Sequence, residues 1–384
     1  MRTPQNTQPK VSKAPSLRFP EFKGEWERCK LGSLTTKVGS GSTPKGGSTV
    51  YSSDGHCFVR SQNVGMGYLI LDDIAYISND IHQKHKGTEI KDNDVLLNIT
   101  GASIGRTAIA TKDVDGGNVN QHVCIIRSNG KIDPRFLCDY IQTDKIQKYI
   151  QGLQTGGSRE GLNFEQIRSF PICLPTICEQ KKIAKLLDLI NERIATQVRI
   201  IERLETLIRG IAHKFFKQGE PNVRMSDCLH CSSSTLQESD VKELGAYPVY
   251  GANGIVGYLD TYNTDNEAIY IIKDGSGVGT VSYVNGKCSA TGTLNILQAK
   301  DSFSLRYLYF MLRAFSFEPY RTGMAIPHIY FKDYGKAKIY CPSYELQVQY
   351  ADLLSSIEQK KITEQHILTD LRYQKQYLLR QMFI

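Results

Sequence analysis

The chain has 384 residues, 40% of them hydrophobic and 22% charged, which is enough for two or three globular domains. No apolar run approaches the ~18 residues that a membrane-spanning helix requires, so the pattern excludes a helical membrane protein. The 47 lysines and arginines exceed the 39 acidic residues and give a net charge of +8. That charge is compatible with a polyanionic partner, although many proteins without one share it.

The first residues, MRTPQNTQPKVSKAPS, are polar and basic and contain prolines. They lack the apolar stretch of a secretory signal, so we expect residues 1–16 to form a flexible leader on a cytoplasmic protein. The ten cysteines follow no regular spacing. Their one CxxC pair, Cys228 and Cys231, has no second pair to complete a four-ligand zinc site, which favours reduced cysteines.

Residues 17–170 are predicted to form a first variable domain. Four β-rich runs, CFVRS, YLILDD, DVLLNIT and HVCIIRS, are separated by turns of Gly, Asn and Asp, and a helical stretch follows at 134–151. Residues 219–340 repeat this plan with YPVYG, AIYIIKD, TVSYV and TLNILQA, followed by a helical stretch at 304–315. Both segments therefore indicate mixed α/β domains with loop-rich surfaces.

Residues 171–218 contain a long amphipathic helix, expected over 179–216. Apolar residues recur there in alternating steps of four and three, with charges off the seam and Gln197 as its one polar member. A second, more polar copy is expected within 341–384, and it places Lys361, Glu364 and Lys375 at seam positions. The apolar seam comprises Ile183, Leu187, Ile190, Ile194, Ile201, Leu204, Ile208 and Ile211 in the first helix, and Tyr350, Leu354, Ile357, Leu368, Leu371 and Leu378 in the second.

Each helix could simply pack on its own domain. A long amphipathic helix without a partner leaves its apolar stripe exposed, however, so we favour an antiparallel pair within one chain. Such a pair would hold the two variable domains apart.

The chain repeats itself, which supports this organisation. At a shift of 167, Pro175 matches Pro342, and Leu162 and Phe164 match Ile329 and Phe331. Upstream, FVRSQNVGMGYL (58–69) matches PVYGANGIVGYL (248–259) at a shift of 190. LLNITGASIGRTA (96–108) matches YIIKDGSGVGTVS (270–282) at a shift of 174. The predicted fold class is α+β, with two mixed α/β domains separated by two long antiparallel helices that form an intramolecular coiled coil.

The loops of both domains are rich in the side chains that contact base edges and phosphates. Taken singly, each such residue is more often a solvated loop residue, but they cluster at matching places in the two repeats. The candidate DNA contacts are Ser42, Thr43, Lys45, Arg60, Gln62, Asn63, Ser103, Arg106, Asn120, Gln121, Ser158 and Arg159 in the first domain, and Tyr250, Asn253, Lys273, Ser276, Lys287, Thr291, Thr293, Arg321 and His328 in the second.

Motifs for catalysis are missing. GASIGRT (101–107) has one residue too few between its glycines for a phosphate-binding loop, and an arginine where that loop needs lysine. Its repeat copy lacks a basic residue, so tight turns between strands explain both copies better. Asp80, His82 and His85 lie in a charged stretch that indicates an exposed loop more than a metal site. His213 and His366 are expected on solvated helix faces.

The whole chain resembles the specificity subunit family of type I restriction-modification systems. The resemblance is carried by LRFPEFKGEWERCKLGSL, by FPICLPTICEQKKIAKLLDLINERI, by the pair YPVYGANGIVGYLD and IIKDGSGVGTVSY, and by the helix after CPSYELQ. It implies that each variable domain is a target-recognition domain that reads one half of a split target in double-stranded DNA. It also implies that the helices set the spacing and dock two methyltransferase subunits.

By the same resemblance, restriction subunits with an ATP-driven motor would join this core. S-adenosylmethionine, ATP and Mg²⁺ would belong to those partners, and this chain would carry no catalytic residue, metal or membrane contact of its own. Two alternatives stay open: a non-catalytic adaptor that binds proteins or glycans through its duplicated β-rich domains, and a nucleotide-dependent enzyme built on GASIGRT.

Overall fold

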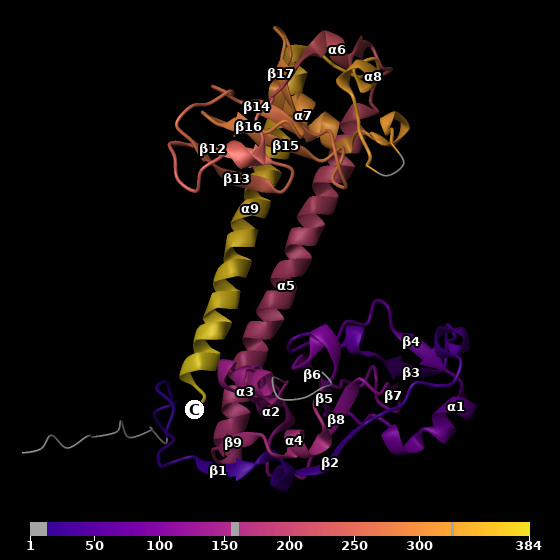
Figure 1. Ribbon diagram of the computed structural model, residues 1–384, viewed down its shortest axis with the longest axis vertical. Helices are drawn as coiled ribbons and strands as arrows, with labels where there is room; N and C mark the ends of the chain where they lie inside the picture. Colours follow the sequence, from indigo (N-terminus) through magenta and orange to yellow (C-terminus); the bar gives the residue numbers. More distant parts are fainter. Residues whose placement is uncertain (1–13, 155–160, 324–325) are drawn as a thin grey trace, which may run out of the picture. The chain divides into compact units, whose positions relative to one another are not determined.

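A computed structural model describes residues 14–154, 161–323 and 326–384, so most of the predicted leader lies outside the described residues. The chain divides into two compact units (Figure 1). Unit 1 consists of residues 1–196 and 368–384, and unit 2 of residues 197–367. Each unit therefore combines one predicted recognition domain with parts of both long helices. Among the described residues, none of the helices is both long and apolar enough to cross a membrane.

Unit 1 is built on two small sheets and a short strand pair. A four-stranded antiparallel sheet has the order β2-β8-β5-β6, and a three-stranded sheet has the order β4-β3-β7 with β3 and β7 parallel. Strands β1 and β9 pair separately. The strands are β1 (Glu27–Lys30), β2 (Thr35–Ser40), β3 (His56–Val59), β4 (Ala75–Ile77), β5 (Val95–Asn98), β6 (Thr107–Ile109), β7 (Asn118–Val119), β8 (Val123–Ser128) and β9 (Pro171–Leu174). The helices are α1 (Asn79–Lys84), α2 (Pro134–Gln142), α3 (Asp144–Gln154), α4 (Phe164–Arg168) and parts of α5 (Ile177–Phe216) and α9 (Tyr344–Gln381).

Unit 2 has the same topology, strand for strand. Its four-stranded sheet has the order β11-β17-β14-β15, and its three-stranded sheet has the order β13-β12-β16 with β12 and β16 parallel. Strands β10 and β18 form the separate pair. The strands are β10 (Val223–Arg224), β11 (Leu229–Ser233), β12 (Tyr247–Gly251), β13 (Gly254–Leu259), β14 (Ala268–Ile272), β15 (Val281–Val284), β16 (Ser289–Ala290), β17 (Leu294–Ala299) and β18 (Lys338–Ile339). The helices of this unit besides the long pair are α6 (Met225–Cys228), α7 (Leu305–Ala314) and α8 (Phe331–Tyr334). The predicted internal duplication is therefore confirmed.

One alignment between the repeats was wrong by a residue. The backbone N–H of Asn120 donates to Val59 O, and that of Thr291 donates to Tyr250 O. The two contacts are equivalent, so Val59 corresponds to Tyr250 and the shift in this stretch is 191 instead of 190. The error arose because both copies place apolar and glycine residues at similar spacing around the strand end, and letters alone do not fix strand register.

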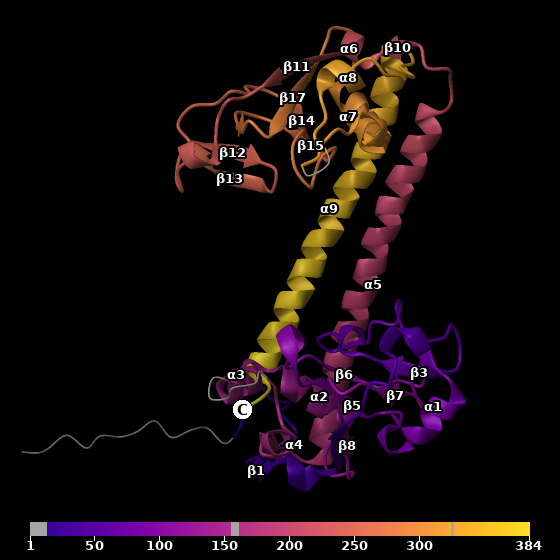
Figure 2. The same cartoon turned by 45° about the vertical axis from the view of Figure 1, so that its right-hand side comes forward.

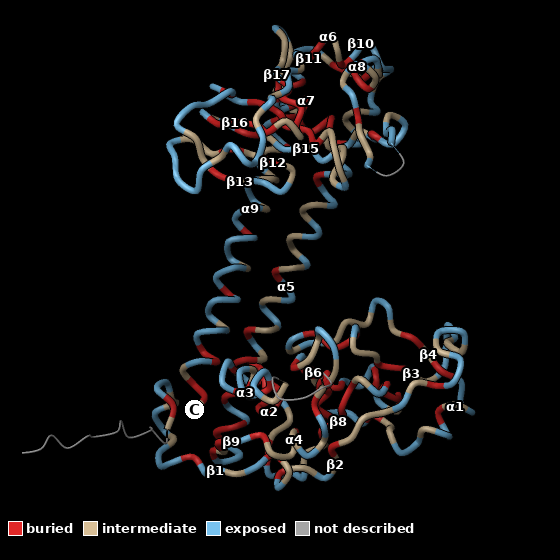
Figure 3. Tube along the Cα trace, viewed as in Figure 1, coloured by how far each residue is buried: buried red, intermediate tan, exposed pale blue. Residues whose placement is uncertain are grey.

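The central strands β5 and β14 are largely apolar because both faces of the four-stranded sheet are covered. In β5, Val95 and Leu97 pack with α2, whereas Leu96 joins the layer beneath the three-stranded sheet. In β14, Ile269 and Ile271 pack with α7, whereas Tyr270 lies in the layer on the other face. Alternation of side chains across a strand therefore gives each unit two apolar layers. Figure 3 shows this burial as red stretches along the strands.

The long helices span Ile177–Phe216 and Tyr344–Gln381, close to the predicted 179–216 and 344–382. In unit 1, Ile183 and Leu187 of α5 share a core with Leu378 of α9 and with Met382, the residue that follows this helix. In unit 2, the ring of Phe215 stacks on that of Tyr350 with centroids 3.9 Å apart. Low numbers thus face high numbers within each unit, as an antiparallel pair requires, and both views show the two helices side by side (Figure 2). All predicted seam residues are buried or half-buried, whereas His213 and His366 are exposed.

Each long helix begins at a repeated glutamine contact. The buried Gln180 accepts a hydrogen bond from Asp133 N (2.8 Å) and donates to Pro175 O (2.9 Å). Gln347 makes the same two contacts, with Ser304 N and Pro342 O, both at 2.9 Å. Asp133 and Ser304 are the N-caps of α2 and α7. One amide therefore joins the start of the long helix to the start of the helix that covers the sheet, in both units.

Candidate nucleic-acid interface

In unit 1, the loops that carry most candidate residues meet at one end of the sheets. Strands β2 and β5 finish at this end, and β8 and β6 begin there, because these neighbours are antiparallel. Strands β3 and β7 are parallel and also finish there. The loops 41–46, 60–63, 99–106 and 120–122 consequently lie together. We call this the loop end of the unit, and the same strand pairing defines a loop end in unit 2.

The glycine-rich stretch GASIGRT is a turn between two antiparallel strands. Gly105 N donates to Asn98 O (3.0 Å) and Arg106 N to Ser103 O (3.1 Å). In unit 2, Gly279 N donates to Ile272 O (2.9 Å) and Thr280 N to Gly277 O (3.0 Å). Four glycines have positive φ at matching positions, namely Gly101, Gly105, Gly275 and Gly279. The predicted turn is confirmed, and its glycines provide backbone conformations that other residues rarely adopt.

The residue after the last glycine of this turn differs between the units. Arg106 in unit 1 corresponds to Thr280 in unit 2, and both are exposed. Arg106 makes no side-chain hydrogen bond or ion pair with another described residue, and neither does Lys45 or Ser103. These three side chains at the loop end of unit 1 are therefore available to a ligand.

Other candidates of unit 1 are engaged within the protein. Arg60 and Gln62 both bond Asp73, through its carboxylate at 3.3 and 2.5 Å. Asn63 is buried and bonds Arg60 N and Ile70 O, which makes it a support of the loop. Tertiary contacts thus reserve these polar groups, which the sequence alone does not show.

A second bonded group links the loops after β2 and β7. Gln121 accepts a hydrogen bond from Thr43 N (2.9 Å) and another from the Thr43 hydroxyl. Asn120 is buried and accepts from His122 N (3.1 Å), while Ser42 bonds the ring of His85 (2.9 Å). Ser158 and Arg159 lie outside the described residues.

The stretch around His82, predicted to be an exposed loop, is helix α1, and His82 is buried. Its ring stacks on that of His56 with centroids 3.7 Å apart, and its Nδ1 bonds Asn118 Oδ1 (2.7 Å). The prediction was wrong because the charged neighbours face solvent while one face of the short helix packs on the three-stranded sheet. No group of three potential ligands that could hold a metal ion occurs among the residues that the structure describes.

In unit 2, the loop end gathers most of the predicted residues. Tyr250 is the residue before the last of β12, Asn253 is at the exposed tip of the β12–β13 hairpin, and Ser276 is exposed in the glycine turn. Thr291 and Thr293 bond each other through their hydroxyls (2.8 Å) in the loop between β16 and β17.

Two further candidates of unit 2 differ from this group, Lys287 in its position and Arg321 in its pairing. Lys287 lies at the opposite end, since it follows β15, whose last residue Val284 pairs with Ala268 at the start of β14. Its ammonium group lies 4.8 Å from the centre of the Tyr262 ring. Arg321 is exposed and paired with Glu318 at 2.8 Å. The structure therefore separates Lys287 from the other candidates and leaves Arg321 with a local acidic partner.

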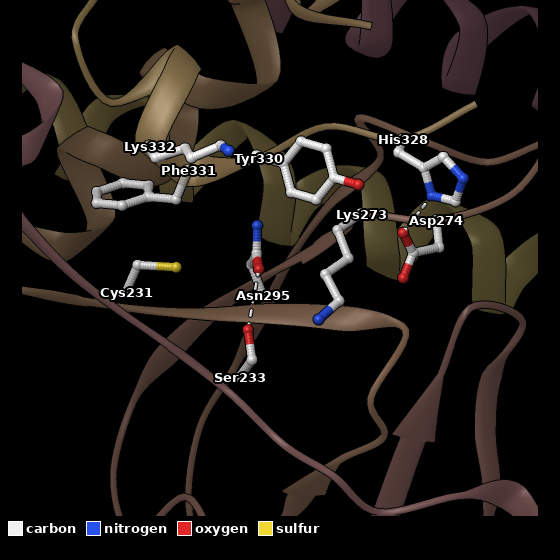
Figure 4. Close-up of a pocket in the computed structure, with 9 residues that line it drawn as sticks. All are labelled: Cys231, Ser233, Lys273, Asp274, Asn295, His328, Tyr330, Phe331 and Lys332. Atoms are coloured by element: carbon white, nitrogen blue, oxygen red, sulfur yellow. Dashed lines mark hydrogen bonds and ion pairs between the residues drawn. The ribbon is translucent and has the colours of Figure 1, made fainter. Parts of the chain in front are cut away.

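A hollow of about 540 Å³ opens at the loop end of unit 2 (Figure 4). We call it the lysine hollow because Lys273 and Lys332 line it and neither forms an ion pair with a described residue. Asp274, the residue next to Lys273 in the chain, is bonded to His328 (2.6 Å). The ammonium of Lys332 lies 5.3 Å from the centre of the Tyr330 ring. The hollow therefore offers positive charge and an aromatic face to a ligand.

The floor of the lysine hollow is polar and fixed. Ser233 Oγ donates to Asn295 Oδ1 (3.3 Å), and Asn295 Nδ2 donates to the Tyr334 hydroxyl (3.1 Å). Burial raises the pKa of the Cys231 thiol to about 11, so this cysteine is no thiolate nucleophile at neutral pH. The hollow suits recognition and not covalent catalysis.

The sequence pattern did not single out four residues of the hollow, namely Tyr330, Lys332, Ser233 and Asn295. A signal for Lys332 was present, since it follows Phe331, the repeat partner of Phe164, and thereby replaces Glu165 of unit 1. Lys273 likewise replaces Ile99, because Leu162 N donates to Ile99 O and Ile329 N donates to Lys273 O, both at 2.9 Å. The two loop ends thus share a backbone and differ in charge.

The chain is similar in sequence to known proteins. The family model for the type I restriction modification DNA specificity domain matches residues 23–206 and again residues 223–372. The chain is 27% identical over 169 residues to the type I restriction enzyme EcoBI specificity subunit of Escherichia coli, covering 43% of this chain and 35% of the relative. It is 22% identical over 312 residues to the putative type I specificity subunit S.MgeORF438P of Mycoplasma genitalium, covering 74% of this chain and 79% of the relative. The chain thus matches about a third of the length of the first relative and most of the second.

Two solved structures share the fold. The crystal structure of the type I restriction-modification system S subunit from M. genitalium superposes with a TM-score of 0.65 at 17% identity, covering 97% of this chain and 99% of that one. A structure from a study of complex assembly and conformational transition of the type I R-M system gives 0.55 at 18% identity, covering 92% and 96%. Because the family model matches both repeats and most of the chain, the chain belongs to the family of type I restriction modification DNA specificity domains.

Proposed function

We propose that this chain is the DNA-specificity subunit of a type I restriction-modification complex, and that each unit reads one half of a bipartite target in double-stranded DNA. The observation that carries the proposal is the pair of loop ends, which have one backbone plan and different side chains. Arg106 of unit 1 corresponds to Thr280 of unit 2, and Ile99 corresponds to Lys273. Glu165 likewise corresponds to Lys332. A common scaffold with different polar groups suits two reading surfaces of unlike specificity.

In this proposal the chain carries no chemistry of its own. S-adenosylmethionine would be bound by two methyltransferase subunits that dock on the long helices, and ATP and Mg²⁺ by the restriction subunits. The helices would set the spacing between the two half-targets. The description of one structural relative as part of a type I assembly supports these partners.

Exchange of one recognition domain tests the division of labour. Residues 219–340 contain both strands of the β10–β18 pair, so replacing them with the matching segment of another family member preserves that pair. We expect the methylated sequence, mapped across a genome in cells that express the chain with its methyltransferase partner, to change in one half only. A change in both halves, or in neither, would refute the assignment of one half to each unit.

Arg106 is expected to contact a phosphate, because it is exposed at the loop end and unpaired among the described residues. Arg106→Gln should weaken binding of target DNA about 8-fold at 0.1 M salt and make the salt dependence shallower by about 0.9 in log–log slope. Fluorescence anisotropy of the methyltransferase-bound protein at several salt concentrations measures both. Lys112→Gln, on the loop after β6 at the other end of the sheet, is the charge-matched control.

An adaptor for proteins or glycans predicts a different result. Its binding would not show the steep salt dependence that release of counterions from DNA produces. Phosphate contacts weaken DNA binding strongly between about 0.05 and 0.2 M salt. An affinity for target DNA that stays the same across this range would favour the adaptor.

A further inference from the structure

The contacts between the long helices and the recognition domains include polar groups at positions where the two repeats differ. On the helices, repeat partners are separated by 167 residues, as for Gln180 and Gln347. On α2 and α7 they are separated by 171 residues, as for the N-caps Asp133 and Ser304. Each contact in one unit can therefore be compared with its counterpart in the other.

In unit 2, an acidic residue on α5 holds two cations. Glu205 accepts a hydrogen bond from Lys361 of α9 (2.6 Å) and another from Arg313 of α7 (3.0 Å). Arg313 also bonds Glu358 of α9 (2.6 Å). The hydrogen bond from Lys361 holds the pKa of the Glu205 carboxyl below its usual value. The repeat partners of Glu205, Lys361 and Arg313 are Arg372, Ile194 and Gln142, so this charge pattern is absent from unit 1.

In unit 1, the polarity is reversed. Lys375 of α9 donates to Gln142 Oε1 (2.9 Å), and Gln142 Nε2 donates to the carboxylate of Asp139 (3.3 Å). Asp139 is only 4% exposed. The repeat partners of Asp139 and Lys375 are Phe310 and Ile208, which belong to the apolar core of unit 2. The acidic group here is on the domain and the cation is on the helix.

A third polar contact joins a residue to its own repeat partner. Gln197 of α5 donates to Glu364 O (3.0 Å) and to the Glu364 carboxylate, and 364 − 197 equals the helix shift of 167. Both side chains are buried, at 8% and 7% exposure. In a pairing of two identical helices, this position would bring glutamine against glutamine or glutamate against glutamate.

We propose that these three contacts form a charge code that admits the other half of the chain as the helix partner and rejects a second copy of the same half. The contacts in such a pair follow when each residue of the missing half is replaced by its repeat partner from the half that is present. In a pair of N-terminal halves, the buried Asp139 would face Ile208, and the half-buried Glu205 would face Gln142 and Ile194, so both carboxyl groups would lose their cations.

A pair of C-terminal halves would be disfavoured for the opposite reason. Arg313 and Lys361 would both face Arg372, Phe310 would face Lys375, and two Glu364 side chains would meet. Removing one partner from a partly buried charge pair leaves the other charge uncompensated and is destabilising. The apolar seam is similar in the two helices, so it does not distinguish a pair of unlike halves from a pair of like halves. The polar positions therefore determine which halves pair.

These contacts would prevent mispairing while the chain is being synthesised. The N-terminal half is synthesised first, and its contacts with α9 stay vacant until residues 344–384 follow. Duplicated domains with similar apolar surfaces are prone to pair with copies of themselves. The inference is independent of the proposed function, because it concerns only how the two halves recognise each other.

A nicked chain tests the code. A specific protease site placed in residues 217–222, between α5 and β10, yields the two halves in equal amounts after cleavage. The nicked protein is unfolded in urea, refolded by dilution and examined by native mass spectrometry. Random association would place about half of the fragments in mixed pairs, whereas the code predicts more than about 90%. A statistical distribution would overturn the proposal.

A variant with the code removed from the first half sharpens the result. Asp139→Phe introduces the phenylalanine that its repeat partner Phe310 supplies to the apolar core of unit 2, and Glu205→Gln removes the carboxylate, so pairs of N-terminal halves should increase at least about tenfold. Glu202→Gln, exposed on the same helix, is the matched control and should leave the distribution unchanged.

The intact chain supplies a second measurement if the fragments fail to refold. Glu205→Arg places a cation against Arg313 and Lys361 and should lower the Tm by about 5 °C. Addition of Lys361→Glu should recover at least half of that loss. Strictly additive Tm shifts of the two substitutions would contradict the code.

Discussion

Replacing both Lys273 and Lys332 with glutamine is expected to weaken binding of target DNA about 60-fold at 0.1 M salt. Both lysines line the lysine hollow at the loop end of unit 2, and neither has an acidic partner among the described residues. Each would neutralise one phosphate, and each phosphate contact contributes about 0.9 to the slope of log affinity against log salt. The double variant should therefore lose about 1.8 from that slope, and the difference from the unchanged protein should vanish as the salt approaches about 1 M.

Anisotropy titrations across salt concentrations measure this prediction, with the protein assembled with its methyltransferase partner. The control variant, Lys112→Gln with Lys287→Gln, removes the same charge from loops at the opposite ends of the sheets. A net-charge effect would weaken both variants equally and would refute a role for the lysine hollow. A changed methylation sequence in the Lys273 and Lys332 variant would assign base readout to these lysines in place of phosphate contact.

The second large effect is a pH dependence of stability that originates at Asp139. Burial raises the pKa of this carboxyl to about 7, with Lys375 acting against the rise. The folded pKa is above the unfolded value of about 3.9, so the folded state binds the proton more tightly. The stabilisation is complete below about pH 4 and is lost as pH rises through about 7. A shift of about three units corresponds to about 4 kcal/mol across this window.

Asp139→Asn removes the titrating group and keeps the shape and the hydrogen bond from Gln142. Between pH 4 and pH 8 the unchanged chain should lose about 4 kcal/mol of unfolding free energy that the variant does not lose. The variant should therefore gain about 4 kcal/mol relative to the unchanged chain over this range. Urea unfolding at a series of pH values, followed by circular dichroism, measures it. Asp144→Asn, on an exposed ion pair with Arg380, serves as the control. Parallel pH curves for Asp139→Asn and the unchanged chain would show that Asp139 does not titrate in this range.

Much of the fold could be predicted because its signals are local. The heptad spacing gave both long helices to within two residues at each end. Alternation with turn residues gave β3, β5 and β8 in the first domain and β12, β14, β15 and β17 in the second. The predicted run YLILDD (68–73) was wrong, because that segment forms no strand. The repeat itself predicted that the two units share one topology. The one-residue error at Val59 and Tyr250 shows the limit, since register depends on the partner strand.

The candidate site was less predictable, because the fate of a polar side chain depends on distant neighbours. Arg60, Gln62 and Asn63 looked as available as Arg106, yet Asp73 and Ile70 engage all three. Lys287 was grouped with the other candidates until strand pairing placed it at the far end of the sheet.

The sequence by itself determined the duplication, the paired apolar seams and the two glycine turns, since each follows from spacing along a single segment. Only the tertiary structure decided which loops share an end, which polar groups stay free and which charges meet across the helices. Lys361, Glu364 and Lys375 illustrate the difference. In the sequence they interrupt the second seam, whereas in the folded units they meet Glu205, Gln197 and Gln142, because residues far apart in the chain become neighbours only on folding.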